Sequence, residues 1–416
     1  MKPQKITLLT SVGSGLEYYD FVIYALLASY MAKQFFPEGN YYAGIMGTFC
    51  IFAVGYFIRP IGGVIFGLFG DCFGRKKTFL ASMLLMAFST AFMGLLPTYK
   101  SIGLSAPIIF ALFRVLQGIS FGAELPGSLT FLTEHVGNAK RGLHCSFMIA
   151  SVGLGVTVGS FITYIVSKSL TTQQMFNWGW RIPFLIGGVL AIAGYFIRKQ
   201  AVETPYFIKN QKKNDFILRE LFRKNFWQVM NGIGIIIFPA CFIVFVLAMP
   251  VYLHQIFNYS MSDIYFVITV GYLWSSLLIP LFGWLSDKVD RKKLLFFPAI
   301  SIVLFGYFLF KILAFKNFYA LLIFILLYQL IIAAMSASYF VMLAEGFPTR
   351  VRFTGVAFCY NVAYALAALI PLLVGYLCSK TSSFAVFWIV LLFAILAVIT
   401  SFSAMKMKNH IQGEII

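Results

Sequence analysis

Several charged and polar side chains lie within apolar stretches of the sequence, and their types suit the handling of protons and anions. Glu17 and Asp20 are one helical turn apart in the first apolar segment, a spacing that places both carboxyl groups on one face of a helix. A later apolar segment carries Arg114, Gln117 and Glu124 as a polar stripe at helical spacing. Carboxyl groups that take up protons, set beside an arginine that binds anions, could couple the two events.

The free-energy cost of burying a charge in a membrane supports a functional role for these residues. An ionised side chain at mid-bilayer costs at least about 2.5–3.5 kcal/mol, so such residues normally face a cavity and mark a transport path. We expect Glu17, Asp20 and Glu124 to couple protons, and Arg114 and Arg59 to meet a carboxylate, with all five facing one cavity. The alternative is a static network of buried ion pairs that only holds helices together.

Other polar side chains in the apolar segments are candidates for ligand contact, although packing between helices explains any single one of them at least as well. The second half of the chain has no charge deep in its apolar segments. We therefore expect the first half to couple protons and the second half to shape specificity. The further candidates for substrate binding are Tyr18, Tyr24, Gln117, Gln329, Tyr360 and Asn361.

The elements that must position these residues are membrane-spanning helices. Of the 416 residues, 60% are hydrophobic and 11% are charged, whereas a soluble domain averages about 25% charged residues. A spanning helix needs about 20 mostly apolar residues. The sequence predicts twelve spans, at residues 6–34, 41–69, 78–97, 105–134, 141–168, 179–200, 223–253, 262–286, 294–314, 318–345, 352–380 and 383–406.

The distribution of basic residues predicts the orientation of the chain. If the N-terminus is cytoplasmic, every loop on that side holds at least two of the 32 Lys and Arg residues, and these loops hold most of the total. The positive-inside rule then places both termini in the cytoplasm. The net charge of +18 therefore reflects topology, and no nucleic-acid partner is expected.

A motif repeated in the two halves predicts an internal duplication. The loop at 67–77 reappears at 283–293, and the pattern around Glu134 reappears around Glu345. Matching halves are typical of transporters that rock one half against the other. We predict an all-α membrane protein with twelve transmembrane helices in two pseudo-symmetric six-helix bundles. Its parts are an N-terminal bundle at 1–200, a cytoplasmic linker at 201–222 and a C-terminal bundle at 223–416.

The repeated loops have a mechanical interpretation. Gly74 allows a tight turn, and Asp71 can cap a helix N-terminus in one conformation, with Arg75 as its partner. Such a contact would break and re-form as the halves move, whereas the alternative is a basic loop that only fixes topology. The residues predicted to form this conformational latch are Gly67, Asp71, Gly74, Arg75, Glu134, Arg141, Asp287, Arg291, Glu345 and Arg350.

Taken together, the motifs resemble the major facilitator superfamily, and within it the metabolite:proton symporter family of proline/betaine, α-ketoglutarate, citrate and shikimate permeases. The chain departs from the family where Leu125-Pro126 replaces the usual Tyr-Gly, and Pro126 is a candidate bend beside Glu124. The resemblance implies proton-coupled import of a small organic acid or zwitterion by alternating access. The matching stretches lie at 15–21, 59–63, 67–77, 114–118, 122–124, 178–183, 203–205 and 345–352.

The resemblance also implies a bacterial inner membrane location and no cofactor beyond the proton as coupling ion. We expect a monomer in the lipid bilayer that binds a small-molecule carboxylate or zwitterion. An exporter or exchanger of organic anions is an alternative, and so is a membrane receptor or sensor that binds its ligand without transport. An enzyme is not expected, because the sequence has no convergent nucleophile or metal-ligand set.

Overall fold

A computed structural model of the chain is helical along its length. It describes residues 3–37, 41–73, 75–122, 124–136, 138–199, 217–348, 351–380 and 384–407. No strand occurs within these ranges, so the prediction of an all-α protein is confirmed.

The first half of the chain forms the helices α1 to α11. A 3-10 turn at Asn138–Lys140 precedes α9, and a π-helical turn at Met175–Gly179 precedes α11. The helices are α1 (Pro3–Leu26), α2 (Ala28–Phe35), α3 (Tyr41–Phe57), α4 (Arg59–Phe73), α5 (Arg75–Leu95), α6 (Tyr99–Ile102), α7 (Ser105–Phe121), α8 (Glu124–His135), α9 (Arg141–Ser169), α10 (Thr172–Gln174) and α11 (Arg181–Lys199).

The second half forms the helices α13 to α20, and polar side chains cap several of them. Ser260 accepts the backbone N–H of Asp263, and Asn317 accepts that of Ala320, which satisfies donors that a helix N-terminus leaves open. The helices are α13 (Ile217–Lys224), α14 (Phe226–Phe257), α15 (Met261–Ser286), α16 (Arg291–Lys311), α17 (Phe318–Glu345), α18 (Arg352–Ala367), α19 (Ile370–Ser379) and α20 (Phe384–Lys406).

The structure places helices in all twelve ranges that the sequence predicts as spans. In the described part of the chain, nine helices are long and apolar enough to cross a membrane, and a tenth span would join Thr172–Gly179 to Arg181–Phe196 across a 45° bend. The pair α1 and α2 and the shorter apolar helix Leu80–Leu95 occupy the other two ranges. The number of spans, the position of the termini and the division into three parts remain predictions.

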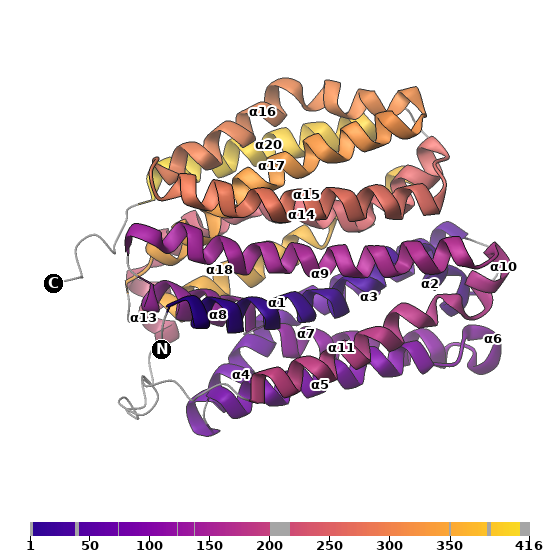
Figure 1. The fold of residues 1–416 in the computed structure, drawn as a ribbon, viewed down its shortest axis with the longest axis horizontal. Helices are drawn as coiled ribbons and strands as arrows, with labels where there is room; N and C mark the ends of the chain where they lie inside the picture. Colours follow the sequence, from indigo (N-terminus) through magenta and orange to yellow (C-terminus); the bar gives the residue numbers. More distant parts are fainter. Residues whose placement is uncertain are drawn as a thin grey trace.

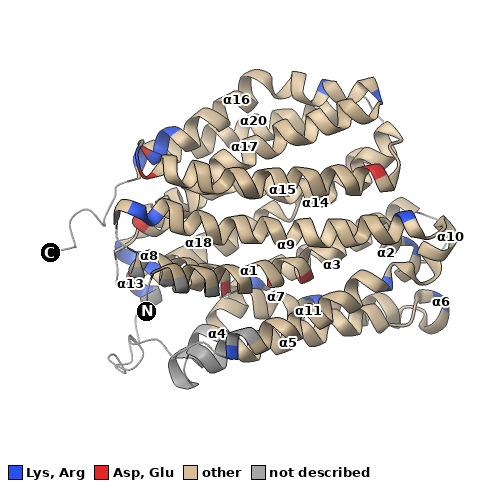
Figure 2. Cartoon of the chain, viewed as in Figure 1, with Lys and Arg blue, Asp and Glu red and all other residues tan. Residues whose placement is uncertain are grey.

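The helices run side by side along one direction, with the two halves of the chain in neighbouring layers (Figure 1). Helix α9 packs against both α1 and α15, so it lies where the halves meet. We use the name latch end for the end of the molecule at which α9 begins and α15 ends, and far end for the opposite one. Charged residues gather near the two ends, and the few along the middle lie in the first half (Figure 2).

Four predicted spans are interrupted within their length. The interruptions lie at Leu27, at Ile58, after Phe121 and at residues 368–369. In three cases a proline stands in the first turn of the following helix, namely Pro60, Pro126 and Pro371. A proline lacks the N–H that would continue the ladder of the preceding helix, so these breaks have a local cause in the sequence.

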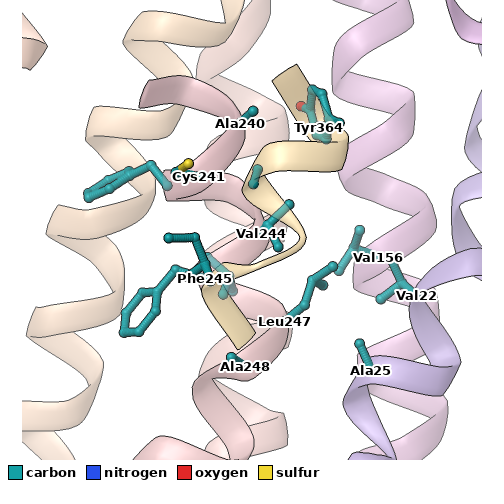
Figure 3. Close-up of a cluster of buried hydrophobic side chains, with 14 of the residues drawn as sticks. Val22, Ala25, Val156, Ala240, Cys241, Val244, Phe245, Leu247, Ala248 and Tyr364 are labelled. Atoms are coloured by element: carbon teal, nitrogen blue, oxygen red, sulfur yellow. The ribbon is translucent and has the colours of Figure 1, made fainter. Parts of the chain in front are cut away.

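Helix α14 forms the centre of the second half, and most of its residues are buried. Val244 and Leu247 of this helix lie in one apolar cluster with Val22 of α1, Val156 of α9 and Tyr364 of α18 (Figure 3). Elements from both halves therefore share one core at this level.

Candidate functional site

Arg114 is fully buried in α7, and one part of its guanidinium group is held by hydrogen bonds. Nη1 donates to the carbonyl of Phe21 at 3.3 Å and to Gln117 Oε1 at 2.7 Å. Gln117 Nε2 in turn donates to Thr90 Oγ1 at 2.7 Å. Nε and Nη2 of Arg114 have no hydrogen-bond acceptor among the described residues. Those two nitrogens share one edge of the group, and one carboxylate can accept from both.

Aromatic rings surround Arg114 and the equally buried Arg59. The Arg114 Cζ lies 4.3 Å from the ring centre of Phe21 and 4.6 Å from that of Tyr24. The Arg59 Cζ lies 4.1 Å from the ring centre of Phe21 and 3.8 Å from that of Tyr56. A desolvated cation–π contact contributes about 2 kcal/mol, which offsets part of the cost of burying the two cations. The Phe21 ring is shared by both.

Asp20 is buried on the side of α1 that faces α11. A Cβ added at Gly187 of α11 would overlap Asp20 Oδ1, so this glycine leaves room for the carboxyl group. Neither carboxyl oxygen of Asp20 has a hydrogen-bond partner among the described residues. Glu17, also buried, is close enough to Asp20 for the two to interact electrostatically. The expected pairing of these two acids on one helix therefore occurs.

Glu124 is the first residue of α8 and is buried. It stands directly beyond the break between α7 and α8, where α7 passes close to α4. A Cβ at Gly122 would overlap the backbone carbonyl of Arg59, so only glycine allows this approach of the two backbones. Two residues before Glu124, the backbone at Gly122 therefore lies directly against that of Arg59.

A small cavity of about 40 Å³ lies between the two halves. This is far smaller than the roughly 300–1,000 Å³ of ligand-binding pockets, so a metabolite fits only if the lining moves. Tyrosines from both halves provide much of the lining, namely Tyr18, Tyr56, Tyr272, Tyr339, Tyr360 and Tyr364.

The cavity differs from the sequence-based expectation in one respect. None of the five predicted charged residues lines it, although Tyr18 and Tyr360 do. Tyr56 both lines the cavity and contacts Arg59, whose Cζ lies 3.8 Å from the centre of its ring. In this conformation Tyr56 connects the cavity to Arg59.

Of the other predicted polar residues, Tyr24 and Asn361 donate hydrogen bonds to backbone carbonyls, whereas neither amide atom of Gln329 has a hydrogen-bond partner among the described residues. Tyr24 donates to the carbonyl of Thr48 at 2.7 Å, and Gln329 is buried on α17 against Gly271 of α15. Asn361 Nδ2 donates to the carbonyl of Gly122 at 2.7 Å, across the two halves. Their role as substrate ligands remains a prediction.

Four of the predicted latch residues meet at the latch end. Arg141 Nη1 lies 3.1 Å from Glu345 Oε1, and Glu345 also pairs with Arg291. Arg291 Nη2 lies 3.1 Å from Asp287 Oδ1. This network joins α9 in the first half to α15, α16 and α17 in the second.

Asp287 also caps a helix of the opposite half. Its Oδ1 accepts the N–H of Gly142 at 2.7 Å, and its Oδ2 accepts the N–H of Leu143 at 3.0 Å. Both donors lie in the first turn of α9, where backbone N–H groups lack partners and favour an anion. The sequence suggested this arrangement for Asp71, and the structure shows it for Asp287.

The structure also indicates a latch-end residue that the sequence analysis missed. Arg352 Nε donates to the carbonyl of Ala344 at 3.1 Å, eight residues earlier, just as Arg141 Nε donates to that of Thr133. The two arginines therefore occupy equivalent places in the repeat, and the equal spacing from Glu134 and Glu345 is the signal that could have found Arg352. The remaining predicted latch residues, Gly74 and Arg350, lie outside what the structure describes, and so do the surroundings of Gly67 and the side chains of Asp71, Arg75 and Glu134.

Comparison with known proteins decides the family. The model of the Major Facilitator Superfamily matches residues 10–273 and 232–412, nearly the whole chain. The chain belongs to the major facilitator superfamily. This confirms the resemblance stated from the motifs.

Bacterial transporters are among the relatives of this superfamily member. It is 32% identical over 384 residues to an inner membrane metabolite transport protein of Escherichia coli (strain K12), which covers 88% of this chain and 85% of the relative. It is 30% identical over 400 residues to the alpha-ketoglutarate permease of the same strain, covering 94% and 91%. It is 27% identical over 423 residues to the proline/betaine transporter of Salmonella typhimurium, covering 98% and 85%.

A crystal structure of a D-xylose-proton symporter has the same fold, with a TM-score of 0.78 over 99% of each chain and 18% sequence identity. The chain is thus a multi-pass membrane transporter of this superfamily and not an enzyme.

Proposed function

We propose that this protein imports a small carboxylate-bearing metabolite, an organic acid or a zwitterion, together with protons. The observation that carries the proposal is the free edge of Arg114. Its Nη1 is already occupied, whereas Nε and Nη2 are buried without an acceptor among the described residues. A substrate carboxylate would accept from both, which gives a charge-assisted and directional contact.

The tyrosine-lined cavity suits the other end of a zwitterion. Six tyrosines from both halves gather there, and aromatic faces attract ammonium groups. A carboxylate at Arg114 and an ammonium group among the tyrosines would place one substrate between the halves. The relatives include a proline/betaine transporter and an alpha-ketoglutarate permease, which is compatible with either an amino acid derivative or an organic acid.

The acids of α1 are the proposed proton carriers. Burial in a low-dielectric site disfavours the charged form of a carboxyl group, and a second carboxyl group nearby adds to this effect. Asp20 combines burial, the absence of a hydrogen-bond partner in the described structure and the proximity of Glu17. Reversible protonation of this pair, linked to the occupancy of Arg114, would couple the proton to the substrate.

The proposal includes an orientation and a location. We place the latch end at the cytoplasmic side of a bacterial inner membrane, because the predicted cytoplasmic loops hold most basic residues. The ion pairs at that end then close the cytoplasmic side, and import requires them to open.

Uptake by purified protein in proteoliposomes tests the function. The panel is proline, glycine betaine, α-ketoglutarate, citrate and shikimate, each with and without an inward proton gradient. We expect accumulation of at least one compound, driven by the gradient and abolished by a protonophore. Accumulation that ignores the gradient would contradict proton coupling, and binding without any flux would indicate a receptor.

A further inference from the structure

A carbonyl group freed by a proline lies where α7 ends, next to Glu124. In a continuous helix the carbonyl of Gly122 would accept the backbone N–H of residue 126, four positions later. Residue 126 is Pro126, which has no N–H. Gly122 keeps helical backbone angles, with φ −63° and ψ −28°. The ladder therefore lacks one hydrogen bond at this point.

The missing donor comes from the other half of the molecule. Asn361 of α18 is 1% exposed, and its Nδ2 donates to the Gly122 carbonyl at 2.7 Å. An unpaired buried carbonyl costs free energy comparable to a lost hydrogen bond. The hydrogen bond between the halves thus uses a carbonyl group of the first half that Pro126 leaves without its helical donor.

We propose that Asn361 is a positioning residue that couples closure of the two halves to the break beside Glu124, by satisfying the carbonyl that Pro126 leaves open. When the halves separate at the latch end, the hydrogen bond is lost and water replaces it. Asn361 therefore favours the state that is closed at this end, in addition to the ion pairs of the latch. This inference rests on the proposed alternating access, and the role of Asn361 as a substrate ligand stays a separate prediction.

A second contact of the same kind lies toward the far end and provides an internal comparison. At the break at Leu27, the N–H of Tyr30 bonds to the carbonyl of Leu27, so the carbonyl of Leu26 is left without that helical donor. Tyr265 of α15 donates its hydroxyl to the Leu26 carbonyl at 2.9 Å. Removing this hydroxyl should ease opening at the far end, in contrast to the effect at Asn361.

A double-mutant cycle with Asn361→Ala and Pro126→Ala tests the coupling, because alanine in place of Pro126 supplies the backbone N–H that a continuous helix would pair with the Gly122 carbonyl. Spin labels at Ala139→Cys and Lys293→Cys, in a background without the native cysteines, report the latch-end distance without substrate or proton gradient. We expect Asn361→Ala to raise the ratio of open to closed molecules about tenfold in the presence of Pro126, and less than about twofold with Pro126→Ala.

The proposal would be overturned if Asn361→Ala changed the open-to-closed ratio equally with Pro126 and with Pro126→Ala, or changed it in neither. Asn361→Leu, which is of similar size and lacks the donor, is the second variant if Asn361→Ala does not fold, with the same expectations. Tyr265→Phe is the matched control and should not raise the open fraction at the latch end. Because the readout is a conformational ratio, the cycle can succeed even if the protein proves not to be a proton symporter.

Discussion

At the residue scale, the site depends on which atoms of a buried cation remain available. Arg114 is held by Gln117 and by the Phe21 carbonyl through Nη1 alone. Lysine would keep the positive charge but lose the side-on pair of donors. The geometry of the group, and not its charge, is therefore the property to test.

Arg114→Lys should reduce substrate uptake strongly while the protein remains folded. A hydrogen bond to a charged group contributes about 1.5–3 kcal/mol, which corresponds to a loss of roughly 10- to 100-fold in uptake efficiency. Initial uptake rates over a range of substrate concentrations measure this, and Arg223→Lys on the exposed face of α13 is the matched control. Uptake by Arg114→Lys within twofold of the control would exclude Arg114 as the carboxylate-binding group.

Asp20→Asn should separate transport from its driving force. The amide cannot carry a proton, so we expect accumulation against a gradient to be lost while exchange of labelled for unlabelled substrate continues. Counterflow and gradient-driven uptake in the same vesicles measure the two activities. Asp263→Asn, in the first turn of α15 at the far end of the molecule, should retain both gradient-driven accumulation and exchange. Gradient-driven accumulation by Asp20→Asn would assign the coupling to another group.

The sequence indicates candidate residues more readily than it indicates the contacts that those residues make. The helical spacing of Glu17 and Asp20 was sufficient to expect their proximity. The same reasoning placed Arg114 and Arg59 on the cavity, whereas neither lines it and Tyr56, which does, contacts Arg59. Contacts across helices depend on rotation and crossing angle, which the spacing within one helix does not contain.

At the scale of the elements, the latch end joins helix termini to carboxylates of the opposite half. Asp287 accepts the N–H groups of Gly142 and Leu143 and pairs with Arg291. The duplicated motif allowed us to predict that these residues act together. It did not indicate that the start of α9 is what Asp287 caps, because that pairing depends on how the halves face each other.

Asp287→Ala should open the latch end. The loss of a helix cap costs about 0.5–2 kcal/mol, so we expect the open-to-closed ratio to rise about tenfold in the same spin-label measurement. Asp290→Ala is the matched control, since Asp290 caps its own helix by accepting the N–H of Lys292. A similar shift in both variants would show that loop stability, and not the contact between halves, sets the ratio.

For the breaks within spans, the sequence likewise indicates the residue that causes a break but not the residue that compensates for it. Pro126 was recognisable in the sequence as a candidate bend. The donor that compensates for it, Asn361, lies in the other half of the chain, where no local pattern connects the two residues. Among the candidate ligands, Asn361 is thus the one for which the structure shows a contact between the two halves.

At the scale of the whole molecule, contacts between the halves occur at both ends. Ion pairs close the latch end, and Thr269 donates to Ser160 at 2.9 Å nearer the far end. Between them lies a cavity of about 40 Å³. In this conformation the halves are in contact on both sides of the cavity, so one end must open to admit substrate.

The central claim is that substrate and proton cross the membrane together. The most direct test is the external pH of lightly buffered proteoliposomes when a transported compound of the panel is added outside. We predict a rise in external pH as protons enter with substrate, which is absent for Asp20→Asn. Substrate uptake with no change in external pH would contradict the account.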